Sequence, residues 1–182
     1  MPIRAHPLVL GVAIFLASEL MFFAALFASY YDLRVSSAVW PMPGTHVDEL
    51  EGAVGTLLLF LSSVFTVLAA RACDRSRIAG ARAWLVAAAV SAAFFIILTL
   101  HGYDDNNFGI TSSAYGSIYY TLTGFHLLHV TVGVGLLIAM AAGVRSKALM
   151  ANQRAGFEAM SYYWHFVFIV WLGIYPTIYW VR

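Results

Sequence analysis

The sequence predicts an all-α protein, a single membrane domain of five transmembrane helices that occupies residues 1–182. Three observations lead to this fold class. Apolar residues make up 62% of the chain and charged residues only 10%, whereas a soluble domain would be about 45–50% apolar and about 25% charged. The apolar residues gather in five runs, each long enough to cross a hydrocarbon core of about 30 Å. Most charged and turn-forming residues fall between these runs.

Each run is expected to form a helix, because lipid offers no partner for unpaired backbone groups. The first run is too long for a cleavable signal and is expected to remain in the membrane. The fourth run is the longest and is expected to tilt. The segments Trp40–Gly44 and Asp104–Gly109 are rich in turn-forming residues and are expected to be loops. The predicted helices are about Leu8–Tyr31, Gly52–Arg71, Ala83–Tyr103, Tyr115–Val144 and Phe157–Val181.

The distribution of positive charge predicts the orientation of the chain. Eight of the ten Lys and Arg residues fall at the N-terminus and in the second and fourth connections, and only Arg34 and Arg182 fall on the opposite side. Because cytoplasmic loops carry an excess of Lys and Arg, the N-terminus is expected in the cytoplasm and the C-terminus outside. The single cysteine, Cys73, excludes an internal disulfide and then faces the cytoplasm. The net charge of +1 gives no indication of a nucleic-acid partner.

Glu19 is the acidic residue that the sequence places inside the membrane. It lies about eleven residues into the first run, near the middle of the bilayer. An ionised carboxylate there costs several kcal/mol, so Glu19 is expected to be protonated or hydrogen-bonded to a neighbouring helix. Two interpretations remain open: a proton-linked or lipid-contacting group, or a neutral packing residue.

Four histidines are candidate metal ligands. His126 and His129 lie three residues apart in the fourth run, His165 lies in the fifth, and His101 ends the third. Axial histidines from facing helices bind b-type haem, and several converging imidazoles bind copper or non-haem iron. In the alternative interpretation, each imidazole hydrogen-bonds across helices and fixes their packing. We favour this alternative, because no H-E-x-x-H pattern occurs and His101 lies at the membrane boundary, far from the depth of His126.

Two further groups of residues are expected to serve packing and anchoring. Aromatic residues near the predicted helix ends, Tyr163 and Trp164 among them, are expected at the level of the lipid headgroups. A second group recurs every four residues in the fourth run and is expected to form a flat face that another helix can approach closely. This face consists of Thr131, Gly135, Ala139 and Gly143.

Several stretches resemble subunit III of the haem-copper respiratory oxidases. SSAYGSIYYTLTGFHLLHVTVG, at residues 112–133, is similar to the family's YGS and TGFHGLHV motif. GFEA, followed by YYWHFVFIVW and IYW, is similar to its closing G-F-E and W-Y-W-H-F-V-D motif. SELMFF, at residues 18–23, is similar to its S-E-x-x-F-F cluster. These motifs extend over nearly the whole chain, which corresponds to the five-helix form of a family that commonly has seven helices.

The resemblance implies a non-catalytic subunit of a terminal oxidase that reduces oxygen to water. Haem and copper are then expected in partner subunits, with no metal in this chain. The resemblance also implies packing against the catalytic subunit I, bound phospholipid, support of proton uptake and a location in the bacterial plasma membrane. The residues that fall on the family's functional positions are Glu19, His126, His129, His165, Glu158 and Trp164.

Two positions depart from the family pattern. Phe168 stands where the family has an aspartate, and Gly102 stands where it has a glutamate. Both changes remove a polar group that could pair across helices or meet a lipid headgroup. Two alternatives therefore remain open. One is an accessory subunit of another respiratory complex, such as nitric oxide reductase; the other is an independent membrane metalloprotein that uses His126, His129 and His165.

Overall fold

The structure is a computed structural model that describes residues 6–41, 43–144 and 154–181. These residues form five long helices, and no strand occurs among them. The helices are α1 (Pro7–Ser36), α2 (Glu49–Asp74), α3 (Ile78–Asp105), α4 (Ala114–Gly143) and α6 (Arg154–Tyr179).

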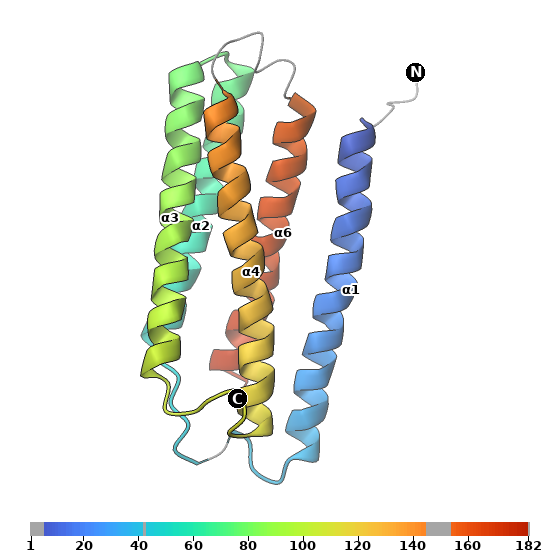
Figure 1. Ribbon diagram of the computed structural model, residues 1–182, viewed down its shortest axis with the longest axis vertical. Coiled ribbons are helices and arrows are strands. Elements are labelled where there is room, and N and C mark those ends of the chain that lie inside the picture. The colour runs from blue at the N-terminus through green and yellow to red at the C-terminus, as the bar shows by residue number, and fades with distance from the viewer. Residues whose placement is uncertain (1–5, 42, 145–153, 182) are drawn as a thin grey trace.

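The helices run side by side along the long axis of the molecule (Figure 1). α2, α3, α4 and α6 form a bundle, and α1 lies along one side of it, where it contacts α4 and α6. Helices that follow one another in sequence run in opposite directions, so the starts of α2 and α4 and the ends of α1 and α3 meet at one end of the bundle.

Three of the helices, α1, α2 and α3, are clearly longer than the apolar runs predict. α2 begins at Glu49 because the side chain of Asp48 accepts hydrogen bonds from the first backbone N–H groups of the helix. α3 continues to Asp105, so the first two residues of the expected loop at Asp104–Gly109 belong to this helix. Hydropathy detects only the lipid-facing length of a helix, whereas capped polar turns extend it beyond the hydrocarbon.

Four of the described helices, α1 to α4, are long and apolar enough to cross a membrane. α6 has 26 residues but does not belong to this group. Its sequence is rich in Tyr and Trp and contains His165, and these residues lower its mean hydropathy. The structure is therefore an all-helical membrane protein in which four helices have the composition of a span.

Serine hydroxyls join α2 and α3 in a reciprocal way. The hydroxyl of Ser62 in α2 donates to the carbonyl of Ala88 in α3 at 2.8 Å, and Ser91 in α3 donates to the carbonyl of Leu58 in α2 at 2.7 Å. Buried alanines, among them Ala69 and Ala88, line this contact and let the two backbones approach.

The close-packing face of α4 is not the one that the sequence predicts. Thr131, Gly135 and Ala139 are exposed, and nothing approaches the position of a Cβ atom at Gly135 within 4 Å. The close contact occurs at Gly133, where an added Cβ would lie under 3.0 Å from two ring carbons of the buried Trp164 in α6. Three members of the predicted small-residue face are therefore left uncovered by the described helices, whereas Gly143 is half-buried, and the closest approach lies on a neighbouring face.

This contact predicts different effects for two substitutions two residues apart. Gly133→Ala should lower the stability of the purified protein by about 1–3 kcal/mol, because an overpacked core forces side chains and backbone to shift. Gly135→Ala should cause no loss, because its added methyl group meets open space. The midpoint of thermal unfolding in detergent measures both effects, and equal midpoints for the two variants would contradict the packing described here.

Candidate functional site

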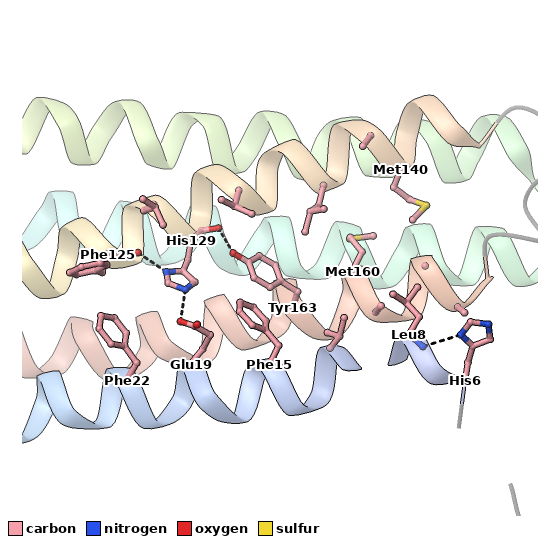
Figure 2. Close-up of a pocket in the computed structure, with 18 residues that line it drawn as sticks. His6, Leu8, Phe15, Glu19, Phe22, Phe125, His129, Met140, Met160 and Tyr163 are labelled. Atoms are coloured by element: carbon pink, nitrogen blue, oxygen red, sulfur yellow. Dashed lines mark hydrogen bonds and ion pairs between the residues drawn. The ribbon is translucent and has the colours of Figure 1, made fainter. Parts of the chain in front are cut away.

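A groove of about 1050 Å³ lies between α1 on one side and α4 and α6 on the other (Figure 2). Most of its lining is apolar, with aromatic rings such as Phe15 and Phe125 and the flexible side chains of Met140 and Met160. Four polar side chains reach it. They belong to His6, Glu19, His129 and Tyr163.

Glu19 and His129 form a hydrogen-bonded pair inside the groove (Figure 2). Nε2 of His129 lies 2.9 Å from Oε2 of Glu19, and the two side chains are 10% and 21% exposed. α1 supplies the glutamate and α4 the histidine, so the pair links α1 to the bundle. The hydrogen bond to a neighbouring helix that the sequence analysis allows for Glu19 is therefore present.

The geometry of His129 restricts how this pair holds its protons. Nδ1 lies 2.7 Å from the carbonyl oxygen of Phe125, which can only accept, so Nδ1 carries a hydrogen. Nε2 then either accepts a hydrogen bond from the carboxyl group of a neutral Glu19 or, as N–H, donates one to an ionised Glu19. The two states differ only in the position of one proton, and the pair has no net charge in either. This neutrality suits a site at membrane depth, where a single uncompensated charge is costly.

The ring of His129 is fixed by its neighbours as well as by its hydrogen bonds. The ring of Phe23 meets it edge-on at 5.2 Å, and the ring of Tyr163 stacks on it at 6.5 Å. The Tyr163 hydroxyl donates to the backbone carbonyl of His129 at 2.9 Å. Tyr163 is therefore buried against α4 and lines the groove, and it is not the headgroup-level anchor that its place near a helix end suggests.

His126 has a different environment, although it lies one turn from His129. Its side chain is fully buried, stacks on Trp171 at 5.2 Å and meets the rings of Phe95 and Phe23 edge-on. Neither ring nitrogen has a hydrogen-bond partner among the described residues. The expectation that each imidazole hydrogen-bonds across helices is therefore met by His129, and by His101 in its contact with Glu51. It is wrong for His126, which aromatic rings surround, and the bond of His165 stays within α6.

The other predicted site residues lie outside the groove. Nδ1 of His165 bonds to the carbonyl oxygen of Ser161 within α6 at 2.7 Å, and Glu158 accepts from the exposed Tyr162 at 2.9 Å. Trp164 is buried against Gly133 and serves packing, so it is not a headgroup-level anchor either.

The histidines do not gather into one centre. Among the described residues, the donor atoms of His126, His129 and His165 do not converge with other His, Cys, Asp or Glu donors into a group of three. His101 pairs instead with Glu51 and Asp105 at the end of α3.

Phe168 and Gly102, the two positions that depart from the oxidase subunit III pattern, each contact a residue of α2. Phe168 packs its ring against Phe60 of α2 at 6.1 Å, so an apolar contact joins the two helices there. Gly102 lies against the carboxylate of Glu51. Sequence reasoning missed the roles of Phe125 and Tyr163, because their contacts to His129 depend on how the helices rotate about their axes.

Comparison with known proteins places this geometry in a family context. The family model described as "Cytochrome c oxidase subunit III" matches residues 3–182. A probable cytochrome c oxidase subunit 3 of Mycobacterium tuberculosis is 36% identical over 183 residues, which cover 98% of this chain and 90% of that protein. Cytochrome c oxidase subunit 3 of Corynebacterium diphtheriae is 31% identical over 185 residues, with the same coverage. The corresponding protein of Thermostichus vulcanus is 31% identical over 172 residues and covers 94% of this chain and 86% of its own length.

The Glu19–His129 hydrogen bond predicts an ordered series of variants. Glu19→Leu should lower the stability by about 1–3 kcal/mol, because it leaves Nε2 of His129 without a partner. Glu19→Gln should cost less, because an amide can donate to the neutral imidazole. The double variant Glu19→Leu with His129→Leu should recover part of the loss, because both partners are then apolar.

Thermal unfolding of the purified protein in detergent measures this series. Glu158→Gln is the matched control, because its carboxylate accepts a hydrogen bond at the exposed surface of α6. If the effects of Glu19→Leu and His129→Leu simply add in the double variant, the two side chains are not coupled.

Proposed function

The chain belongs to the cytochrome c oxidase subunit III family and is a subunit of a haem-copper oxidase, and we propose that it supports this complex without carrying the catalytic centre. Haem and copper then lie in partner subunits, and the chain packs against the catalytic subunit in a bacterial cell membrane. The observation that carries the proposal is the apolar groove between α1, α4 and α6 with the Glu19–His129 pair on its wall.

The hydrogen bonds that the histidine rings already make support a non-catalytic role for the chain. Both ring nitrogens of His129 already have partners, Phe125 and Glu19, and Nδ1 of His165 is held by its own helix. Binding a metal through these atoms would require breaking hydrogen bonds at membrane depth. The alternative of an independent metalloprotein has no such support, and family membership favours an oxidase over a nitric oxide reductase.

The groove is suited to the acyl chains of a phospholipid. It is open along one side, its walls are mostly apolar, and methionines such as Met140 and Met160 adapt their shape to an irregular ligand. Along α1 its lining reaches from His6, just before the helix, past Glu19 to Phe22. We therefore assign the groove to bound phospholipid, with the polar headgroup towards the His6 end.

The Glu19–His129 pair supports a link to proton uptake. One proton lies between Oε2 of Glu19 and Nε2 of His129, and it can reside on either atom without a change in net charge. A group of this kind can retain a proton beside an apolar lipid chain. In this proposal the pair holds a proton near the catalytic subunit and does not itself take part in the reduction of oxygen.

We also propose that α6 crosses the membrane as the fifth span. α6 packs against α1, α2 and α4, and several of its less apolar residues, Tyr163, Trp164, Trp171 and Thr177, are buried among these helices. Five spans place the two termini on opposite sides of the membrane. The excess of Lys and Arg then puts the N-terminus and Cys73 in the cytoplasm.

Removal of the chain from the oxidase tests the supporting role. Without the chain, the complex should lose activity after fewer turnovers and retain less phospholipid, and adding back the wild-type chain should restore both. Add-back of Ala139→Trp should restore neither fully, because an indole at this position fills the groove. Lipid mass spectrometry and the decay of oxygen consumption are the measurements.

Ile138→Trp provides the matched control for this experiment, because Ile138 is exposed on α4 but does not line the groove. An unchanged turnover lifetime in the chain-free complex would show that the chain has no supporting role. Full lipid retention with Ala139→Trp would exclude the groove as the lipid site.

The orientation predicts which reagents reach two positions. A membrane-impermeant thiol reagent should label Cys73 only after intact cells are opened. In a Cys73→Ser background, Thr111→Cys should be labelled in intact cells, because Thr111 is exposed in the loop before α4 at the other end of the bundle. The reverse pattern of labelling would invert the proposed topology.

A further inference from the structure

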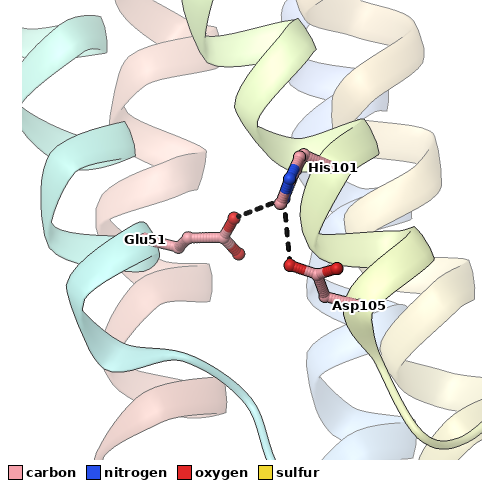
Figure 3. A group of neighbouring side chains, drawn as sticks. All are labelled: Glu51, His101 and Asp105. Carbon is pink, nitrogen blue, oxygen red and sulfur yellow. Dashed lines mark ion pairs between the residues drawn. The ribbon is translucent and has the colours of Figure 1, made fainter.

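A second cluster of ionisable side chains lies at the end of the bundle where α2 begins and α3 ends (Figure 3). Glu51 comes from the first turn of α2, and His101 and Asp105 come from the last turns of α3. Nδ1 of His101 lies 3.5 Å from Oε1 of Glu51 and 3.1 Å from Oδ2 of Asp105. Among the described residues, this is the group of three His, Cys, Asp or Glu residues whose donor atoms all lie within 4.8 Å of one another.

These separations fit a bound metal ion. Zinc binds histidine nitrogen and carboxylate oxygen at about 2.0–2.2 Å in tetrahedral geometry, which places neighbouring donor atoms about 3.3–3.6 Å apart. The two measured distances from Nδ1 are close to this range. One imidazole with two carboxylates is also a donor set that suits zinc better than magnesium or calcium, which prefer oxygen ligands alone.

Helical spacing on α3 and a glycine that faces α2 bring these three donors together. His101 and Asp105 are four residues apart, so they lie on the same face of α3, one turn from each other. Gly102 lets α2 supply the third donor, because an added Cβ at this position would lie under 3.0 Å from Oε2 of Glu51. The glycine that replaces the family's glutamate therefore makes room for the carboxylate of α2.

The surrounding charge favours a cation. Asp48 caps α2 and Asp104 precedes Asp105, whereas no Lys or Arg occurs in residues 35–70 or 83–144. Neither Glu51 nor Asp105 has an ion pair with Lys or Arg in the described part of the chain. The imidazole of His101 is then the group that separates the two carboxylates.

We propose that Glu51, His101 and Asp105 form a binding site for a divalent transition-metal ion of the zinc class, which joins the start of α2 to the end of α3. His101 and Asp105 are 67% and 69% exposed, so the ion enters from the aqueous phase and water completes its coordination. The site is separate from the groove, whose lining includes none of the three residues. It does not depend on the proposed role in the oxidase.

Titration of the purified oxidase complex with zinc chloride tests this site. The wild-type complex should bind one more equivalent of zinc than a complex with His101→Ala, as measured by isothermal titration calorimetry. Glu51→Gln should weaken that binding at least about tenfold. Removing a residue that only hydrogen-bonds to a metal ligand typically costs about 10–100-fold in metal affinity, and Glu51 is itself a ligand in this proposal. Zinc should also raise the thermal unfolding midpoint of the wild type more than that of His101→Ala.

Two controls separate a built site from general attraction to an acidic surface. His46→Ala should keep the extra equivalent, because His46 is exposed in the connection before α2 and is not part of the cluster. Gly102→Ala keeps all three donors and should still weaken binding, because its methyl group displaces Glu51. Equal zinc stoichiometry and affinity in the wild type and His101→Ala would overturn the proposal, as would equally tight binding of magnesium or calcium.

Discussion

The hydrogen bond between Glu19 and His129 is the interaction on which the attachment of α1 depends most. Lipid provides little hydrophobic force between helices, so packing and hydrogen bonds decide how they associate. α1 lies at the side of the bundle, and its polar contacts include this bond and the one between Tyr31 and Thr177 of α6 at 3.2 Å. The groove borders α1 from His6 to Phe22, between the start of the helix and the turn that follows Glu19.

The same constraint accounts for most polar groups inside the bundle. Ser62 and Ser91 donate to backbone carbonyls of the facing helix, and the indole of Trp171 donates to Thr56 across α2 and α6 at 2.9 Å. His126 departs from this pattern, because aromatic rings surround it and neither of its ring nitrogens has a hydrogen-bond partner among the described residues. A neutral imidazole tolerates this environment better than a charged one.

The sequence was sufficient for the five helices and for the place of Glu19 near the middle of α1, because both follow from hydropathy along the chain. It was not sufficient to separate His126 from His129. Three residues turn a helix by about 300°, so the two rings point about 60° apart, and only the neighbouring helices decide which one faces the groove. The same reason explains why Gly133, and not Gly135, meets another helix. The cluster of Glu51, His101 and Asp105 could not be predicted from the sequence either, because Glu51 lies on a different helix, 50 residues before His101.

The proton arrangement of the Glu19–His129 pair has a consequence for the electrical behaviour of the protein. A full elementary charge that crosses the whole membrane gains about 2.3 kcal/mol per 100 mV. Transfer within the pair moves a proton less than the 2.9 Å between the two atoms, which is under about a tenth of a hydrocarbon core of about 30 Å. The membrane potential therefore biases its position by no more than about 0.2 kcal/mol per 100 mV. A single hydrogen bond contributes about 0.5–1.5 kcal/mol, so local contacts such as the one between Nδ1 of His129 and the carbonyl of Phe125 outweigh the potential in setting where this proton resides.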